Sequence, residues 1–439
     1  MKASFIKAFD ILIIGVVLTL VTIGILFIYS SGIDSKGNLV TNEYIKQLIW
    51  ASCGLILMIF FALFDYRKFE KHIYWFYGAL CIILLLLKIL ARSHKGASSW
   101  IGIGEFGIQP SEFGKIAFAF SLSKYLTDTE RLHPLLRLAG ATGLLALPAG
   151  LILIQPDTGT ASTYVAIYFL MLFFSDIPLR FTLFIFGIAT STIFFTILPI
   201  WNQFIKDNSY YIINALTIPT LKILIIGTAI TICLFCLIVR RYFKGPKYFY
   251  WLSYGFAIIS AGLILSTPVL KVLEKNVYQE KRIVSFLDPT KDPQGAAYHL
   301  NQSLIAIGSG GFRGQSYLHG TQSHLRFLPE QSTDFIFSVL SEESGFLGCL
   351  VIFVLYFLFL SKNISIIQNT SNQFGYYIAA GFLGMFSIHF FVNVGMVMGK
   401  MPITGLPLMF ISYGGSSLIT AMASAGILMG IQYRKYNFS

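Results

Sequence analysis

The sequence predicts an all-α polytopic membrane protein with about twelve transmembrane helices and one large extracytoplasmic loop. Hydrophobic residues make up 55% of the 439 residues, and charged residues only 12%. Apolar runs repeatedly exceed the ~18 residues that mark a membrane-spanning helix. No stretch has the composition of a soluble domain, so we interpret residues 1–439 as a single transmembrane domain.

Hydropathy places the spans, and basic residues orient them. The predicted spans are residues 10–30, 47–64, 73–91, 113–126, 137–154, 160–176, 181–200, 221–240, 248–267, 335–360, 375–398 and 408–432. An even number of spans puts both termini on one side of the membrane. Basic residues gather beside the spans on that side, which should therefore be cytoplasmic. They are Lys2, Lys7, Arg67, Lys68, Lys71, Lys124, Arg131, Arg137, Arg180, Arg240, Arg241, Lys244, Lys247, Arg434 and Lys435.

The extracytoplasmic side then carries the large loop, residues 268–334, and shorter loops at 31–46, 92–112 and 399–407. The net charge of +12 fits the positive-inside rule together with contact to anionic lipids or a phosphate-bearing ligand. No P-loop or dinucleotide fingerprint occurs on the cytoplasmic side. We expect chemistry, if any, on the outer side, and no nucleic-acid partner.

Residues 201–267 contribute two further apolar runs joined by a basic turn, and we interpret them as an inserted helical hairpin. The hairpin shows no charge within the membrane, so we expect it to be peripheral. Cys233 and Cys236 have redox spacing, but within a span two small apolar fillers are the better interpretation.

The stretch from Phe327 to Gly348 is polar at first and then becomes apolar, so Asp334 stands where a membrane helix should begin. An ionised carboxylate in hydrocarbon costs ~2.5–3.5 kcal/mol, and Asp334 therefore has to face water, a cation or the interface. In helical register Asp334, Ser338, Ser341 and Glu342 would share one face, which indicates a site. The alternative is helix capping by Asp334, with Thr333 as the rival cap.

A second polar cluster opens the fourth span at Gln109-Pro110-Ser111-Glu112. Capping explains Pro110 and Ser111 but not Lys115, which lies three residues after Glu112 on the same helical face. At membrane depth such a charge pair either stabilises its own burial or orients a site. The turn at Gln155-Pro156-Asp157 has a mainly structural interpretation, with a contribution to the same cavity as the alternative.

The large loop adds cations and glycines. Gly308-Ser309-Gly310-Gly311 before Arg313 could form a backbone nest for phosphate, although a flexible turn is the default interpretation. Arg282, Arg313 and Arg326 are cations of the type that phosphate groups need. Near the end of the chain, Ser412 could line a polar groove, while the surrounding small residues allow close helix packing.

Several separate motifs together resemble the SEDS family (shape, elongation, division and sporulation), and the resemblance covers most of the chain. The motifs are Gln109-Pro-Ser-Glu112-x-x-Lys115, Gln155-Pro-Asp157-x-Gly159-Thr160, Asp288-Pro with Asp292-Pro, Tyr298-His299-x-x-Gln302-Ser303, Ala306 to Gly311, Phe327 to Phe337 around Thr333-Asp334, Glu342-Glu343-x-Gly345, Asn393-x-Gly-Met396 and Ser412 to Ser416. His319-Gly320-Thr321-Gln322 is similar to the elongation branch of the family rather than the division branch.

The resemblance implies a ten-span core and a peptidoglycan glycosyltransferase that polymerises lipid II into undecaprenyl-diphosphate-linked glycan for cell elongation. It implies that Asp334 is essential, with Glu112 and Lys115 beside it, in a bacterial cytoplasmic membrane. It also implies a class B penicillin-binding protein and other elongation-complex proteins as partners. The substrate-binding candidates are Glu112, Lys115, Arg282, Arg313, Gln302, Glu342 and Ser412.

Transfer between two lipid-linked sugars needs a general base, and we assign Asp334 to this role. The diphosphate leaving group needs neutralising by Arg, Lys or a divalent ion such as Mg²⁺ or Mn²⁺, so a metal cofactor is an open possibility. The rival functions are a flippase and a transporter of a lipid-linked precursor. A flippase should carry charges across the whole membrane depth. Here mid-span charges are sparse, and we interpret His389 as a histidine satisfied inside the bundle.

Overall fold

The computed structural model describes residues 10–90, 101–103, 106–204, 210–242, 246–274, 277–289 and 295–435. Lys2, Lys7 and Lys244, used above to orient the chain, lie outside the described residues. The chain divides into two compact units, residues 1–177 with 302–439, and residues 178–301. Each unit is described by itself.

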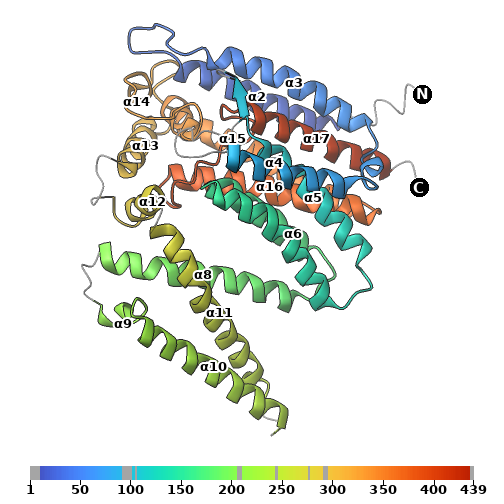
Figure 1. Ribbon diagram of the computed structural model, residues 1–439. Helices are drawn as coiled ribbons and strands as arrows, with labels where there is room; N and C mark the ends of the chain where they lie inside the picture. Colours follow the sequence, from blue (N-terminus) through green and yellow to red (C-terminus); the bar gives the residue numbers. More distant parts are fainter. Residues whose placement is uncertain are drawn as a thin grey trace. The chain divides into compact units, whose positions relative to one another are not determined.

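The first unit holds most of the long helices (Figure 1). Its elements are α2 (Ile11–Ser31), α3 (Glu43–Leu63), the 3-10 helix η1 (Tyr66–Phe69), α4 (Ile73–Leu90), β1 (Ile101–Ile103), β2 (Phe106–Ile108), α5 (Pro110–Asp128), α6 (Pro134–Ile154), α7 (Thr158–Phe173), α14 (Thr321–His324), α15 (Ile336–Asn369), α16 (Gln373–Val397) and α17 (Gly415–Lys435). The two short strands pair antiparallel, with Ile101 opposite Ile108.

The second unit contains the predicted hairpin. Its helices are α8 (Leu179–Phe204), α9 (Tyr211–Asn214), α10 (Pro219–Tyr242), α11 (Tyr248–Glu274) and α12 (Val277–Leu287), and α13 (Ala296–Gly310) joins the two units. α11 packs against both α10 and α8. The hairpin is predicted to carry no charge within the membrane. Lys222, in the predicted span 221–240, is buried on α10, and its Nζ donates to Ser266 Oγ at 3.0 Å.

Each of the twelve predicted spans coincides with a helix. Within the described residues, nine helices are long and apolar enough to cross a membrane, and α4 and α7 are shorter apolar helices. α17 begins at Gly415 rather than at residue 408, since the preceding residues fold into a turn in which Phe410 has a φ of 69°. The span count itself stays a prediction.

Small residues bring the central helices of the first unit together. α3 and α17 run side by side (Figure 1), and a Cβ added at Gly426 of α17 would overlap the backbone of Met58. Close backbone approach of this kind replaces the hydrophobic driving force that helices lack in lipid. α16 and α17 are buried along most of their length and form the centre of the unit.

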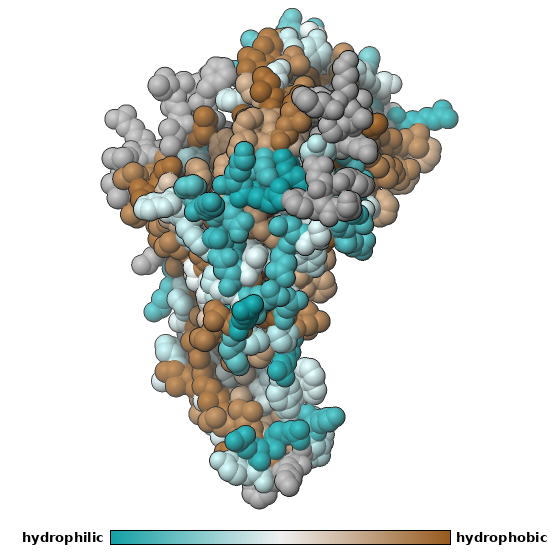
Figure 2. Space-filling model, turned by 90° about the vertical axis from the view of Figure 1, so that its right-hand side faces the viewer, coloured by the Kyte–Doolittle hydropathy of each residue, from teal (hydrophilic) through white to brown (hydrophobic). Residues whose placement is uncertain are grey.

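The ends of α2 and α17 meet. Gln432 Nε2 donates to Asp10 Oδ2 at 2.8 Å, and Lys362 of α15 pairs with the same carboxylate at 2.7 Å. Figure 2 looks toward the side where these helix ends lie, and hydrophilic groups gather on this face while hydrophobic atoms lie around them. Helix ends that emerge from a membrane have this polar character.

Candidate active site at the start of helix α15

Asp334 lies in a turn directly before α15 and is half-buried. The N-cap position of α15 is Phe335, which makes no side-chain cap, so the capping interpretation of Asp334 does not hold. The Asp334 backbone N–H donates to Glu330 O at 3.1 Å. A Cβ added at Gly405 would lie 3.5 Å from Asp334 Oδ2, which places the turn of residues 405–407 against the carboxylate.

Asn393 of α16 fixes this arrangement. Its Nδ2 donates to Asp334 O at 3.0 Å and to Leu406 O at 2.8 Å. One amide therefore holds the backbone before α15 and the 405–407 turn together. The Asn393 Oδ1 atom is buried without a hydrogen-bond partner.

Glu112 and Lys115 form the predicted pair at the start of α5. Lys115 Nζ lies 2.6 Å from Glu112 Oε1, and the side chains are 0% and 3% exposed. Lys115 also lies 3.0 Å from His389 Nε2 on α16. The pairing is confirmed, and Lys115 is fully buried in it, while its assignment to substrate binding stays a prediction.

His389 is the residue whose part in the site was missed from the sequence. It is satisfied inside the bundle, as expected, but its partner is Lys115, and its Nδ1 lies 2.9 Å from Pro407 O. His389 and Asn393 are four residues apart and share one face of α16. Two polar residues at i, i+4 in an otherwise apolar helix are the sequence pattern that could have indicated the part of His389 in the site.

The two proline-containing motifs also meet. Gln109 Nε2 donates to Asp157 Oδ2 at 2.7 Å, while Asp157 Oδ1 caps α7 by accepting from Thr160 N at 3.0 Å. A Cβ at Gly159 would lie 2.6 Å from Thr404 O. The starts of α5 and α7 therefore lie together, and α7 packs against the loop whose 405–407 turn flanks Asp334.

The predicted polar stripe on α15 does not form, because Asp334 precedes the helix. Ser338 bonds Ser303 Oγ at 2.8 Å, and Ser341 donates to Phe337 O at 2.7 Å. Both hydroxyls are buried and used within the protein. The stripe argument assumed a helix through Asp334, and the turn at residues 330–335 removes that register.

The Glu342 carboxylate is fully buried and hydrogen-bonded within the protein, while its assignment to substrate binding stays a prediction. It accepts hydrogen bonds from the start of α14, namely from Thr321 Oγ1 at 3.1 Å, Gln322 N at 2.6 Å, Ser323 N at 3.1 Å and Ser323 Oγ at 2.9 Å. A carboxylate at a helix N-terminus satisfies orphan N–H groups. Glu342 therefore anchors the loop before Asp334 through both of its carboxylate oxygens.

Ser412 is likewise structural in this arrangement. Its Oγ accepts from Leu408 N at 2.8 Å, and its carbonyl accepts from Gln47 Nε2 at 3.1 Å. Tyr413 N donates to Ser332 O at 2.8 Å, two residues before Asp334. The predicted groove residue thus shapes the turn that lies beside the site.

The remaining candidates differ in position. Arg313 is exposed, and Gln302 on α13 is half-buried next to Ser303, which donates to Val397 O at 2.7 Å. Arg282 lies on α12 in the second unit. No contact joins Arg313 or Gln302 to Asp334 among the described interactions.

A break in α15 lies just beyond Glu343, at Gly345, whose φ of 64° and ψ of −162° are not helical. The turn of residues 311–316 fills this break and takes over its backbone hydrogen bonds. These are Gln315 N to Glu342 O at 3.0 Å, Ser316 N to Glu343 O at 3.1 Å, Phe346 N to Gly311 O at 2.9 Å and Leu347 N to Phe312 O at 3.2 Å. Of the glycines predicted as a phosphate nest, Gly310 packs against α15, where an added Cβ would overlap Ser341 O, and Gly311 O accepts from Phe346 N.

Glu343 ties this region to α2 and α14. Its Oε1 accepts from Ser30 Oγ, and its Oε2 accepts from Leu318 N at 3.2 Å. His324 Nε2 lies 3.3 Å from Oε1, and the imidazole Nδ1 lies 3.0 Å from Ile33 O. The contact with Glu343 raises the pKa of His324 above its ordinary value.

This raised pKa predicts a pH-dependent stability. Protonated His324 stabilises the fold, so its contribution is complete below the unfolded pKa of about 6.5 and is lost as pH rises through the raised folded pKa. Thermal unfolding in detergent should show wild type more stable than His324→Gln at low pH, with the difference shrinking as pH rises. A difference that grows with pH would contradict this sign.

An apolar groove of about 530 Å³ lies between α3, α4, α5 and α17. Its lining is entirely apolar and includes Ile108 and Pro110, which flank Gln109 of the site, together with Phe69 and Phe76. The groove therefore runs from the start of α5 along the apolar part of these helices. Such a lining suits a hydrocarbon chain.

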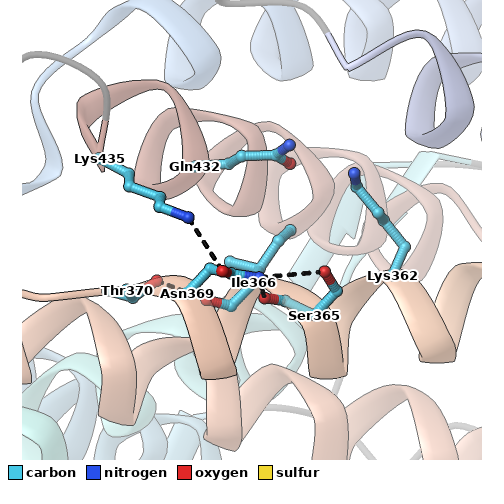
Figure 3. Close-up of a pocket in the computed structure, with 7 residues that line it drawn as sticks. All are labelled: Lys362, Ser365, Ile366, Asn369, Thr370, Gln432 and Lys435. Atoms are coloured by element: carbon cyan, nitrogen blue, oxygen red, sulfur yellow. Dashed lines mark hydrogen bonds between the residues drawn. The ribbon is translucent and has the colours of Figure 1, made fainter.

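A separate polar pocket of about 100 Å³ lies between the later parts of α15 and α17 (Figure 3). Lys435 Nζ donates to Asn369 Oδ1 at 2.9 Å, and Asn369 Nδ2 donates to Ser365 O at 2.7 Å. Asn369 is the last residue of α15, whereas Asp334 precedes its first residue. This pocket is therefore not part of the candidate site.

A divalent metal site was left open by the sequence. Among the described residues, no group of three or more His, Cys, Asp or Glu side chains could hold a metal ion. Mg²⁺ is commonly bound by one or two carboxylates plus substrate phosphates and water. A divalent ion bound by Asp334 would therefore take its other ligands from the substrate phosphates and water.

Apolar helices with buried ionisable groups at the start of α5 and along α16 define a polytopic membrane protein whose polar site is built from separate spans. The family model for cell cycle proteins of the FtsW, RodA and SpoVE type matches residues 10–212 and 202–437. The chain belongs to this family, which confirms the SEDS resemblance seen in the motifs.

Curated relatives agree with the elongation branch. Peptidoglycan glycosyltransferase RodA of Treponema pallidum (strain Nichols) is 43% identical over 436 residues, which is 99% of this chain and 100% of the relative. Peptidoglycan glycosyltransferase MrdB of Escherichia coli (strain K12) is 33% identical over 379 residues, 86% of this chain and 82% of the relative.

Solved structures share the fold. A chain of the structure "Structural coordination of polymerization and crosslinking by a peptidoglycan synthase complex" has a TM-score of 0.65 and 23% identity, with 98% of both chains covered. The crystal structure of Thermus thermophilus rod shape determining protein RodA has a TM-score of 0.58 and 21% identity, again with 98% of both chains covered. The helical membrane fold is thus confirmed.

Proposed function

We propose that this protein is a peptidoglycan glycosyltransferase that polymerises lipid II, with Asp334 as its general base. The observation that carries the proposal is the position of half-buried Asp334. Asn393 donates to its backbone carbonyl, Gly405 lies against its Oδ2, and His389 links the 405–407 turn to the buried Glu112–Lys115 pair. The relatives named peptidoglycan glycosyltransferase support it. The site is proposed to face the extracytoplasmic side of the bacterial cytoplasmic membrane, with both termini cytoplasmic.

In this mechanism Asp334 accepts the proton of the acceptor GlcNAc 4-hydroxyl as that oxygen attacks the MurNAc anomeric carbon. The bond to the diphosphate breaks, and undecaprenyl diphosphate leaves with the electron pair. A single base without a nucleophilic carboxylate partner fits inversion at the sugar. General-base catalysis of this kind typically contributes about 10²–10⁴-fold.

The apolar groove supports a lipid-linked substrate. Its lining from Ile108 and Pro110 to Phe76 suits a polyprenyl chain, and it begins beside Gln109, next to Glu112 of the site. We assign the diphosphate to exposed Arg313, with a divalent cation shared with the substrate as a further proposal. Arg282, which lies in the second unit, stays a prediction from the sequence. A bound divalent ion would neutralise the leaving diphosphate.

The partner assignment rests on the structural neighbour, which comes from a peptidoglycan synthase complex. We propose a class B penicillin-binding protein as the transpeptidase partner of this chain, with further elongation-complex proteins. Co-purification with such a transpeptidase from the native membrane, followed by cross-linking, tests the assignment.

The decisive assay separates polymerisation from transport. Purified protein, reconstituted with fluorescent lipid II, should produce glycan strands that a muramidase digests. A flippase would instead move the label across the bilayer without forming a product. Translocation without glycan would contradict the proposal.

Glu112→Gln should lower the polymerisation rate by roughly tenfold or more. The change removes the negative charge that holds the fully buried Lys115, and a hydrogen bond to a charged group is worth about 1.5–3 kcal/mol. Initial rates of glycan formation measure the effect. An unchanged rate would count against a role for this pair.

A further inference from the structure

His389 lies at the centre of the site, but the mechanism above gives it no part. Its side chain is completely buried on α16, between Lys115 of α5 and the backbone of the 405–407 turn. A lone buried histidine needs partners for both ring nitrogens. Here Nε2 faces the buried Lys115 ammonium at 3.0 Å and the Thr163 hydroxyl at 3.4 Å, and Nδ1 faces the carbonyl of Pro407 in the turn that flanks Asp334.

The chemistry of the partners fixes the proton on the imidazole. The Lys115 ammonium has only donors, so His389 Nε2 must accept from it at 3.0 Å. The proton therefore sits on Nδ1, which donates to Pro407 O at 2.9 Å. His389 is a neutral imidazole in one tautomer that joins the Glu112–Lys115 pair to the 405–407 turn.

The 405–407 turn lies directly against the Asp334 side chain. Gly405 adjoins Asp334 Oδ2, and Asn393, one helical turn beyond His389, donates to both Leu406 O and Asp334 O. Gly405 thus lies against Asp334, while Leu406 and Pro407 are held by hydrogen bonds from α16. Any shift of Pro407 would move the neighbours that define the position of the carboxylate.

We infer that His389 is a positioning residue. Through its hydrogen bonds to Lys115 and Pro407 it fixes the 405–407 turn, and this turn fixes the position of the Asp334 carboxylate. The inference rests on the proposed function. Misplacement of a reacting group by about 1 Å can cost about 10²-fold in rate. His389 should therefore affect the chemical step more than substrate binding.

Three substitutions separate the two hydrogen bonds. His389→Asn can keep a donor near Nδ1 for Pro407 but removes the acceptor for Lys115. His389→Gln can keep an acceptor near Nε2 but removes the donor to Pro407. His389→Leu removes both while keeping an apolar volume. Phe391→Leu is the matched control, because Phe391 lies on the same helix and is 58% exposed.

Purified variants should be compared in lipid II polymerisation. We expect His389→Leu to lower kcat by about 30- to 100-fold with KM within about threefold, and each amide variant to lie between it and wild type. Phe391→Leu should match wild type. Wild-type kcat in a folded His389→Leu would overturn the inference. If that variant does not fold, wild-type kcat in both amide variants would overturn it.

Thermal unfolding midpoints test the link to Lys115 without relying on activity. In a Lys115→Met background, His389→Leu should cause less than half the shift that it causes in wild type, because its partner is already absent. Equal shifts would overturn the link. A wild-type protein that makes no glycan would instead refute the proposed function, and this thermal comparison would still report on the histidine.

Discussion

Asp334→Asn should lower the rate of lipid II polymerisation by about 10²–10⁴-fold, the contribution typical of a general base. Asparagine keeps the shape of the side chain and the backbone contacts, in which Asp334 N donates to Glu330 O and Asp334 O accepts from Asn393. The loss should therefore fall on the chemical step. Initial rates with purified protein and fluorescent lipid II measure it, alongside an unfolding curve that should match wild type.

The matched control is Asp34→Asn. Asp34 lies in the loop between α2 and α3, which is predicted to be extracytoplasmic, and its Oδ1 accepts from Lys36 N and Asn38 N. An asparagine oxygen can accept the same bonds, so this variant should polymerise lipid II at the wild-type rate. Normal polymerisation by Asp334→Asn would remove the assignment of the base.

Gly345→Ala should destabilise the folded protein by about 3 kcal/mol or more, because the φ and ψ of Gly345 belong to a region that is essentially restricted to glycine. A methyl group there would also overlap Gly314 N, which lies in the turn that fills the break. Yield of monodisperse protein in detergent and the thermal midpoint should both fall. Catalytic loss should follow from the unfolding.

Gly308→Ala serves as the comparison for this glycine. Gly308 is within α13, and a Cβ there would meet nothing within 4 Å. Alanine in an exposed helical position should be neutral or stabilising by up to about 1 kcal/mol. Equal midpoints for the two alanine variants would show that the break in α15 does not require glycine.

The sequence predicted the helices well because the length of apolar runs is a local property, and every predicted span coincides with a helix. The Glu112–Lys115 pair was also predictable, since three-residue spacing on a helix is local. The position of Asp334 near a helix start followed from the same kind of pattern. These predictions needed no knowledge of distant contacts.

Contacts between distant segments could not be predicted from the sequence. Nothing in the neighbourhood of Glu342 shows that its carboxylate accepts hydrogen bonds from the start of α14. His389 looked like an isolated core residue because Lys115 lies 274 positions away. Lys222 was overlooked because it begins an apolar run, and only the fold shows that it is buried.

The turn of residues 311–316 supplies the backbone hydrogen bonds that α15 lacks at its break. This turn is therefore a poor place for insertions. Lengthening that turn, or inserting an epitope into it, would leave two carbonyls and two amides of the helix without partners. Within the described residues, the loop from Ser35 to Gly37 makes no backbone hydrogen bond to α15. Tags and fluorophores therefore belong there, although both segments lie at the surface of the molecule.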